Sequence, residues 1–205
     1  MQNKEQSTQE RILDAAKAEF LEKGFRTASL RTIVKEAGVT TGALYGYYDS
    51  KEALFDALTE DCYEHFLSAY RNALDDFDKL PIDEQPERMS TVSQACLEKL
   101  LLYMFEHREA FHLILLCSEG TRYSSMKDEL VQLEIHATHR YYCVLEKLGT
   151  PAPRIDPRLE HILVTGLMNA YFEMIIHDMP LTDAQQYLQE LHSFYSAGWL
   201  KIMGQ

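Results

Sequence analysis

Apolar residues recur along the chain every three or four positions, the spacing that places them on one face of a helix. The first such stripe lies within residues 7–23 and is followed by Gly24, a residue that commonly ends a helix. Its members are Ile12, Leu13, Ala16, Phe20 and Leu21. No stretch alternates apolar and polar residues between turns in the way that strands do. The pattern therefore predicts an all-α fold.

The same periodicity, interrupted by glycine, proline and short polar segments, predicts a series of helices. Their expected ranges are 7–23, 29–36, 41–47, 50–78, 89–106, 108–118, 124–148, 157–178 and 182–203, with Asp49 or Ser50 opening the fourth. Prolines in "KLPIDEQPERMS" and "LGTPAPRID" predict linkers. Because the first helices are short and the later ones long, we expect one domain over residues 1–50 and another over 51–205.

The second and third predicted helices are separated by a very short turn. "LRTIVKEAG" supplies the first of them, Gly38 and Val39 form the turn, and Thr40 suits the N-cap of the next. Two helices joined in this way form a helix-turn-helix, whose second helix enters the major groove of DNA. The same geometry also occurs as plain packing, so the pattern alone leaves both interpretations open.

The third predicted helix has an unusual composition. Gly42 and Gly46 each cost about 1 kcal/mol in a helix relative to alanine, and they share a face with Tyr45. Such a thin face allows a close approach to another surface. Lys51 stands in the first turn of the next helix, where a cation opposes the helix dipole unless a phosphate lies beside it.

Charge is distributed unevenly along the chain. The net charge is −12, yet residues 1–52 hold eight Lys and Arg against eight Asp and Glu, so the whole excess lies in residues 53–205. An acidic body repels nucleic acid. If DNA is the partner, the first quarter of the chain must contact it.

Other functional chemistry is not indicated. The four cysteines are far apart and are expected to be buried and reduced. His136 and His139, with Glu134 nearby, have a spacing that could hold a metal but more often marks a helix face. Ser118 lacks a G-x-S-x-G context. We predict no catalytic residue, metal or cofactor.

Neither a long apolar run nor a secretory leader is evident. We therefore expect a cytoplasmic protein without a membrane partner.

The segment "GFRTASLRTIVKEAGVTTGALYGYYDSKEALFDAL" resembles the N-terminal domain of the TetR/AcrR family of transcriptional regulators. Matching features are Gly24-Phe25, Ser29-Leu30-Arg31, Ile33, Ala37-Gly38-Val39-Thr40, Gly42, Leu44-Tyr45, Tyr47-Tyr48, Lys51 and Leu54. The resemblance covers about residues 7–58. Beyond them the chain matches only in its layout of helices.

The resemblance implies DNA contacts by Ser29, Arg31, Thr40, Thr41, Gly42, Tyr45, Tyr47 and Lys51. Ser29 and Lys51 would bind phosphates, and Thr40, Thr41, Tyr45 and Tyr47 would contact the operator from the recognition helix. Thr41 stands where many relatives carry Lys or Arg, and Gly46 where many carry a bulky residue. We therefore expect few direct base contacts.

It further implies that the larger body is a helical effector-binding and dimerisation domain. Candidate ligand-lining residues are Phe66, Tyr70, Tyr103, Phe111, His112, His136, Tyr142 and Phe172. Candidate dimerisation residues are Leu159, Leu163, Gly166, Leu167, Leu188, Leu191, Tyr195 and Trp199. Either set could equally be ordinary core. The acidic excess hints at a cationic or amphipathic ligand, although acidic surfaces also serve solubility.

The leading functional hypothesis is a homodimeric regulator, a repressor released from operator DNA by an unknown small molecule. A helical enzyme and a protein-interaction module are the alternatives. The sequence does not identify the effector or the operator.

Overall fold

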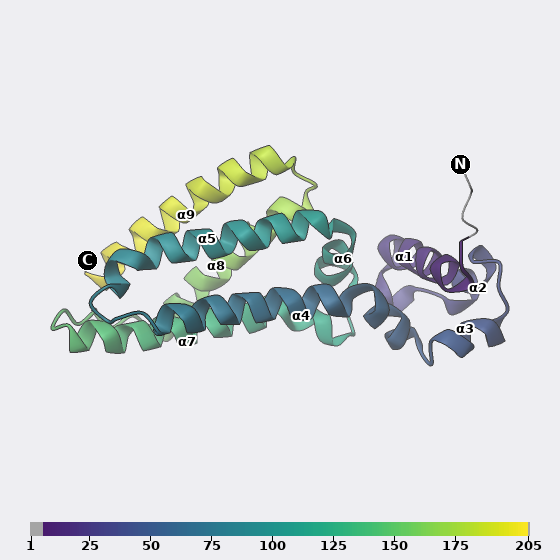
Figure 1. Cartoon of the computed structure of the whole chain (residues 1–205), viewed down its shortest axis with the longest axis horizontal. Coiled ribbons are helices and arrows are strands. Elements are labelled where there is room, and N and C mark those ends of the chain that lie inside the picture. Colours follow the sequence, from purple (N-terminus) through teal and green to yellow (C-terminus); the bar gives the residue numbers. More distant parts are fainter. Residues whose placement is uncertain (1–5, 205) are drawn as a thin grey trace. The chain divides into compact units, whose positions relative to one another are not determined.

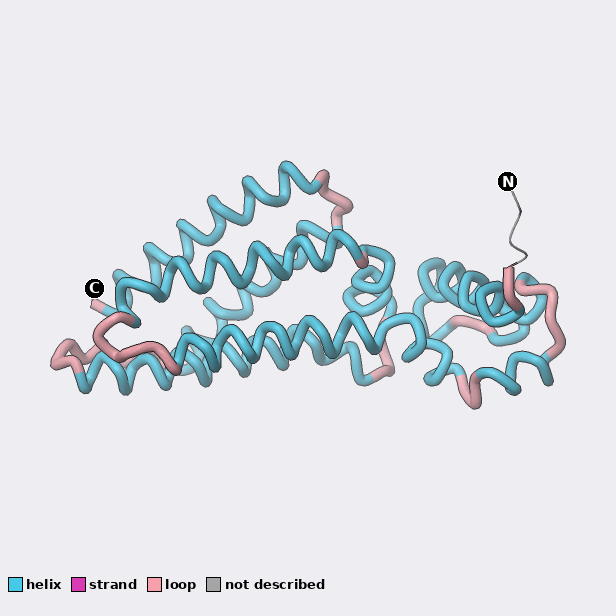
Figure 2. The backbone as a smooth tube through the Cα atoms, viewed as in Figure 1, coloured by secondary structure: helices cyan, strands magenta, loops and turns pink. Residues whose placement is uncertain are grey.

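The computed structural model describes residues 6–204, and every regular element within them is a helix, so the predicted all-α class is confirmed (Figure 1). The elements are α1 (Thr8–Thr27), α2 (Leu30–Glu36), α3 (Thr41–Tyr47), α4 (Lys51–Asp78), α5 (Gln85–Glu106), α6 (Arg108–His112), a π-helical turn (Leu113–Cys117), a 3-10 turn (Arg122–Ser125), α7 (Met126–Lys147), α8 (Pro157–Ile176) and α9 (Leu181–Met203). Short loops join them (Figure 2).

Two expected boundaries need correction. The predicted linker over residues 79–90 is shorter, because α5 begins at Gln85 and places Pro86 in its first turn, where the missing N–H is not needed. The helix expected over residues 108–118 is interrupted, since α6 passes into a π-helical turn at Leu113.

The caps of the early helices follow the sequence closely. Ser7 begins α1 with a capping box, in which its side chain accepts from the N–H of Glu10 and the Glu10 carboxylate accepts from the N–H of Ser7. Gly24 has a φ of 71°, so the straight part of α1 ends there although helical hydrogen bonding resumes for one more turn. Ser50, rather than Asp49, caps α4 by accepting from the N–H of Ala53 at 3.0 Å.

The chain packs into two compact units, which differ from the division expected at residue 50. The first contains residues up to Glu64 together with Arg108–Ser124, and the second contains His65–His107 and the residues from Ser125 onward. Residues 108–124 join the first unit because the π-helical turn packs against α1. The functional boundary at residue 50 stays a prediction.

Aromatic packing holds the first unit together. The Phe55 ring meets Phe20 and Phe25 edge to face, with centroids 5.1 and 5.3 Å apart. Tyr123 extends this cluster and donates a hydrogen bond to Asp56 at 2.6 Å. Leu44 is fully buried, so α3 is anchored on the core by one face.

The second unit is a set of long helices in which α7 packs on α8 and α5 on α9 (Figure 1). Its buried residues come from all of these helices and from the second half of α4. Tyr171 on α8 donates a hydrogen bond to the Leu97 carbonyl of α5 at 2.8 Å, which satisfies a phenol that has no access to solvent.

Candidate nucleic-acid interface and ligand cavity

A tight turn joins α2 to α3, as the sequence predicts. Gly38 has a φ of 62°, a left-handed conformation that glycine adopts without strain, and the N–H groups of Gly38 and Val39 return to the last carbonyls of α2. The Thr40 hydroxyl accepts from the N–H of Ala43 at 3.1 Å, so its predicted role as the N-cap of α3 is confirmed.

Helix α3 has a buried side and an exposed side. Leu44 and the following Tyr48 are buried against the unit. Away from this buried side, Tyr45 is 48% exposed and Tyr47 51% exposed, and Thr41 is exposed as well.

The two glycines of α3 have no packing role in the described chain. A Cβ atom built at either Gly42 or Gly46 would meet nothing within 4 Å. Their absence of side chains is therefore not required by the fold, and it leaves a low, open surface beside two exposed phenols.

Ser29 begins α2, but its backbone already has a buried partner. The Ser29 N–H donates to Oε1 of Glu19 at 2.9 Å, and Lys23 donates to both carboxylate oxygens of Glu19. Although burial alone would raise the pKa of Glu19, these hydrogen bonds lower it below its ordinary value. Sequence reasoning missed this contact, which places an ion pair next to the start of α2.

The hydroxyl of Ser29 makes no capping bond, and Arg31 is exposed on the same helix.

The unusual position of Lys51 has a partner within the fold. Its ammonium group donates to the carbonyls of Arg26 and Ala28 at 3.2 and 3.3 Å and lies 4.7 Å from the centroid of the Phe25 ring. The side chain thus connects the start of α4 to the end of α1. Contact with a DNA phosphate stays a prediction for it.

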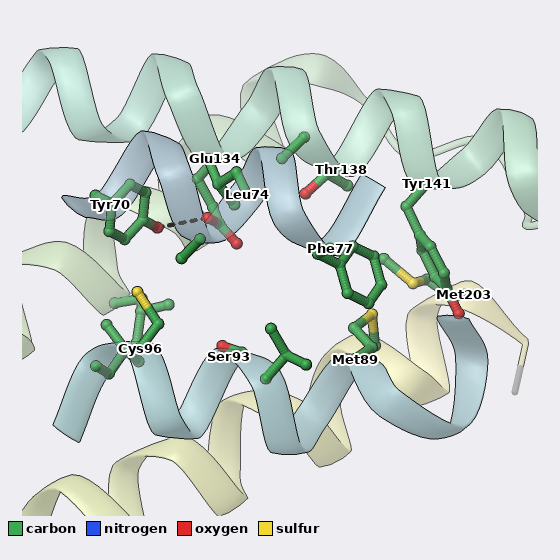
Figure 3. A pocket seen from close by; sticks show the side chains of 15 residues that line it. Tyr70, Leu74, Phe77, Met89, Ser93, Cys96, Glu134, Thr138, Tyr141 and Met203 are labelled. Atoms are coloured by element: carbon green, nitrogen blue, oxygen red, sulfur yellow. Dashed lines mark hydrogen bonds between the residues drawn. The ribbon is translucent and has the colours of Figure 1, made fainter. Parts of the chain in front are cut away.

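A cavity of about 110 Å³ lies within the second unit (Figure 3). Its walls come from α4, α5, α7, α8 and the end of α9, and most are apolar. The lining residues that the later argument uses are Phe77, Ser93, Cys96, Glu134, Thr138 and Tyr141.

One hydrogen-bonded pair sits in the wall of this cavity. The Tyr70 hydroxyl donates to Oε2 of Glu134 at 2.5 Å (Figure 3). Burial, followed by the neighbouring carboxylate, raises the pKa of Tyr70 well above its ordinary value. Burial also raises the pKa of Glu134, a shift that the Tyr70 hydrogen bond and the Arg140 guanidinium partly offset.

The thiols of the chain differ in their surroundings. All four cysteines are free, as expected, and Cys62 and Cys117 are buried. Burial and then the Glu134 charge raise the pKa of Cys96 in the cavity wall to about 11. Cys143 is exposed, which corrects the expectation that all four are buried.

Of the eight ligand candidates, the structure brings only Tyr70 to the cavity. The rings of Phe66 and Phe172 pack together in the core of the second unit, and Tyr103 stacks on His65. The remaining four candidates are Phe111 and His112 in α6 of the first unit, His136 on an exposed face of α7, and Tyr142 beside Glu160.

Sequence reasoning also missed most of the true lining residues. One signal was available in α7, where Glu134 falls on the stripe of Leu130, Thr138 and Tyr141, which are four, four and seven positions away from it. A carboxylate on an otherwise apolar face indicates a special environment.

The metal interpretation of the two histidines finds no geometric support in the described residues. His139 pairs with buried Glu160 at 2.8 Å, whereas Glu134 is bonded to Tyr70. No group of three or more His, Cys, Asp or Glu side chains within residues 6–204 is arranged to hold a metal ion.

The dimerisation candidates on α8 and α9 fall into different environments. Leu188 is fully buried in its own unit and Leu167 lines the cavity, so both pack within the chain. Gly166 permits the close approach of Tyr195, whose hydroxyl oxygen would lie 2.7 Å from a Cβ atom at that position. Leu159 is exposed, while Leu163, Leu191, Tyr195 and Trp199 are partly exposed.

Three further apolar residues on these helices are exposed. Ile162 on α8 is 63% exposed, and on α9 Tyr187 is 47% and Phe194 is 73% exposed. Periodicity shows which residues share a side of a helix, but it does not show which side faces outward. Within residues 6–204, no helix combines the length and apolar character needed to cross a membrane.

An all-helical chain with a turn-joined helix pair near its start and a larger helical body defines the class of helix-turn-helix proteins. The sequence profile of bacterial regulatory proteins of the tetR family matches residues 12–58. Residues 12–58, which include α2 and α3, are therefore the N-terminal domain of this family.

Comparison with individual proteins agrees with this assignment. The regulator UidR of Escherichia coli K12 is 39% identical over 75 residues, 37% of this chain and 38% of UidR. The uncharacterised regulator YvdT of Bacillus subtilis is 31% identical over 141 residues, 68% of this chain and 63% of YvdT. The repressor KstR2 of Rhodococcus jostii is 29% identical over 101 residues, 49% of this chain and 43% of KstR2. The chain thus aligns with less than two thirds of each relative.

Solved structures show the same fold over nearly the whole chain. The probable transcriptional regulatory protein RHA5900 has a TM-score of 0.61 at 19% identity, covering 90% of this chain and 97% of that one. NalD, described as the secondary repressor of the MexAB-OprM multidrug efflux pump in Pseudomonas aeruginosa, has a TM-score of 0.54 at 23% identity, covering 90% and 93%.

Proposed function

We propose that the protein is a homodimeric, effector-responsive repressor that binds operator DNA in the cytoplasm through α3. The observation that supports this most directly is the outer face of α3, where Thr41 and Tyr45 flank glycines whose open space no part of the described fold requires. Kinship with regulators, among them one named a repressor, adds weight.

The DNA-facing surface is small and close to electrically neutral. Residues 1–52 have no net charge, and the acidic remainder repels a phosphate backbone. Specific contacts therefore come from α3 and from a few cations, of which Arg31 is exposed. With Gly46 in place of a bulky residue, we expect recognition to depend on Tyr45 and Tyr47 and on the close approach of the backbone.

Dimerisation is proposed through α8 and α9. Leu159 and Ile162 lie three positions apart on α8, and Tyr187, Leu191 and Phe194 recur on one face of α9. Exposed apolar groups concentrated on neighbouring helices are typical of interfaces. A two-fold dimer also presents two recognition helices to successive turns of DNA.

Effector response is proposed to arise in the cavity of the second unit. A ligand held there that favours one arrangement of the dimer over the other shifts the population away from the DNA-binding form. This requires only different affinities of the ligand for the two forms.

The test begins with the selection of bound sequences from a random pool of DNA duplexes by the purified protein. We expect enrichment of a two-fold symmetric site, with binding that weakens steeply as salt rises. Tyr45→Ala should lose this binding while remaining folded. Ile82→Ala, which truncates an exposed apolar residue in the loop before α5, is the matched control and should bind normally. Failure of the folded protein to enrich any sequence would refute the proposal.

The dimer is tested by light scattering. Phe194→Glu should shift the protein toward the monomer, whereas Leu102→Glu, at an exposed position of α5, should leave the dimer intact. A monomeric wild-type protein, or equal effects of the two variants, would contradict the assigned interface.

A further inference from the structure

The cavity of the second unit is apolar with one charged group. Among its lining residues are aromatic, aliphatic and sulfur-containing side chains and small hydroxyls, but no Lys, Arg or His. Glu134 is the single ionisable carboxyl group in that lining. From this arrangement we infer that the cavity binds a small, mostly apolar amine, whose protonated nitrogen contacts the Glu134 carboxylate. The inference rests on the proposed effector role of the cavity and names its ligand class.

The carboxylate is positioned for such a contact. Its Oε2 accepts the hydrogen bond from Tyr70, which holds the group in place. Figure 3 shows the second oxygen of Glu134 directed toward the middle of the cavity. This oxygen has no hydrogen-bond partner within residues 6–204. Because this acceptor is fixed in orientation and has no donor, it can bind an N–H group of a ligand.

The surrounding charges favour a cation over a neutral donor. Tyr70 on α4 and Cys96 on α5 face Glu134, and their raised pKa values keep both groups uncharged even above neutral pH. The Arg140 guanidinium partly offsets the raised pKa of Glu134, but it is paired with Asp78 and does not line the cavity. The ionised carboxylate is therefore incompletely compensated. A protonated amine supplies the missing charge and forms a charge-assisted hydrogen bond.

Aromatic walls suit the same ligand. Phe77 and Tyr141 line the cavity, and Figure 3 shows both rings on the side away from Tyr70. Aromatic faces attract cations and accommodate hydrocarbon equally well. The hydroxyls of Ser93 and Thr138 offer additional acceptors to an ammonium group.

The size of the cavity limits the ligand. Its volume of about 110 Å³ is somewhat below that of an engineered cavity of about 150 Å³ that binds benzene. An amine smaller than benzene is therefore a suitable probe. Isobutylamine and cyclobutylamine meet this description, and isobutanol and cyclobutanol are their neutral counterparts of nearly equal shape.

The experiment measures binding of these four probes to the full-length dimer by calorimetry. We expect each amine to bind roughly tenfold or more tightly than its alcohol, because a hydrogen bond to a charged group is stronger than a neutral one. Glu134→Gln keeps the size of the side chain and an acceptor for Tyr70, and should reduce amine affinity to that of the alcohol. Glu146→Gln, on an exposed part of the same helix, is the matched control and should bind amines like the wild type.

Protonation provides a second readout. Ionised Glu134 is required for the ion pair, so amine affinity should fall as the pH is lowered and Glu134 becomes protonated. Because burial raises the pKa of Glu134, part of the population is protonated in mildly acidic buffer. Amine binding there should release a proton, which is detected as a dependence of the binding heat on the buffer. Glu134→Gln should show neither effect.

The outcomes separate this inference from the proposed function. Equal binding of amines and alcohols, no binding of any probe by the folded dimer, or undiminished amine binding by Glu134→Gln overturns the amine assignment, even if the protein binds DNA. Amine binding that depends on Glu134 but leaves DNA binding unchanged supports the assignment and refutes the effector role instead.

Discussion

Replacing both helical glycines of α3 by alanine should stabilise the protein and weaken its binding to DNA. Gly42 and Gly46 lie in a helix, neither has a positive φ, and an added Cβ would meet no atom within 4 Å. Alanine is better than glycine in a helix by about 0.5–1 kcal/mol, so Gly42→Ala/Gly46→Ala should raise the free energy of unfolding by about 1–2 kcal/mol. For a protein of this length, that corresponds to a rise in Tm of roughly 2–8 °C.

The effect on DNA should have the opposite sign. Two methyl groups on the outer face of α3 would keep the backbone from its closest approach to the groove. Overpacking of a close contact costs about 1–3 kcal/mol, so the affinity for the selected DNA site should fall by roughly 5- to 150-fold. Thermal unfolding followed by circular dichroism measures the first effect, and fluorescence anisotropy with labelled duplex measures the second.

A matched control stabilises the protein elsewhere. Thr91 is exposed on α5 and its hydroxyl donates to the Arg88 carbonyl of its own helix, so Thr91→Ala should gain a few tenths of a kcal/mol without affecting DNA binding. If the glycine variant gains stability and retains full affinity, the glycines have no part in DNA recognition. If it loses stability, the assignment of open space around α3 is wrong.

Three further results are expected. Gly166→Ala should lower the free energy of unfolding in urea by about 1 kcal/mol, because the new methyl group collides with the Tyr195 hydroxyl. In a Tyr195→Phe background the same substitution should raise the free energy of unfolding. Equal effects in both backgrounds would exclude this contact. Lys51→Met should lower the free energy of unfolding by about 1 kcal/mol through its lost carbonyl contacts, and the salt slope of DNA binding should fall by about one only if Lys51 also binds phosphate. Glu19→Gln should make the free energy of unfolding less dependent on pH in the acid range. The lowered pKa of Glu19 stabilises the wild-type protein above pH 4.5, the ordinary value of the group, and this stabilisation is lost as the pH falls through the folded pKa. An unchanged pH dependence would argue against this role of Glu19.

Local chemistry made the first unit predictable. The limits of α3 were predicted correctly because Gly38 and Thr40 specify the end of one helix and the start of the next. The ends of α5 and α6 were less clear. Pro86 is compatible with both a linker and a first helical turn, and a π-helical turn depends on packing that periodicity does not record.

The cavity and the outer faces could be predicted only in part. Tyr70 and Glu134 are distant in the sequence, and their contact depends on how α4 and α7 pack. On α9, one face packs within its own unit and another is exposed, so a continuous apolar pattern does not show that Leu188 is internal while Phe194 is external. Lys51 was correctly identified as unusual, but its carbonyl partners, Arg26 and Ala28, lie 25 and 23 residues earlier in the chain.

The unequal exposure of the four thiols has a practical consequence. Cys143 is exposed on α7, Cys62 and Cys117 are buried, and the thiol of Cys96 stays protonated at neutral pH because its pKa is about 11. A thiol-specific spin label applied at neutral pH should therefore attach to Cys143 in the unmodified protein. Each two-fold dimer would then carry one symmetric pair of labels. Pulsed electron paramagnetic resonance could follow the distance between them as DNA or an amine is added, without removing a native cysteine.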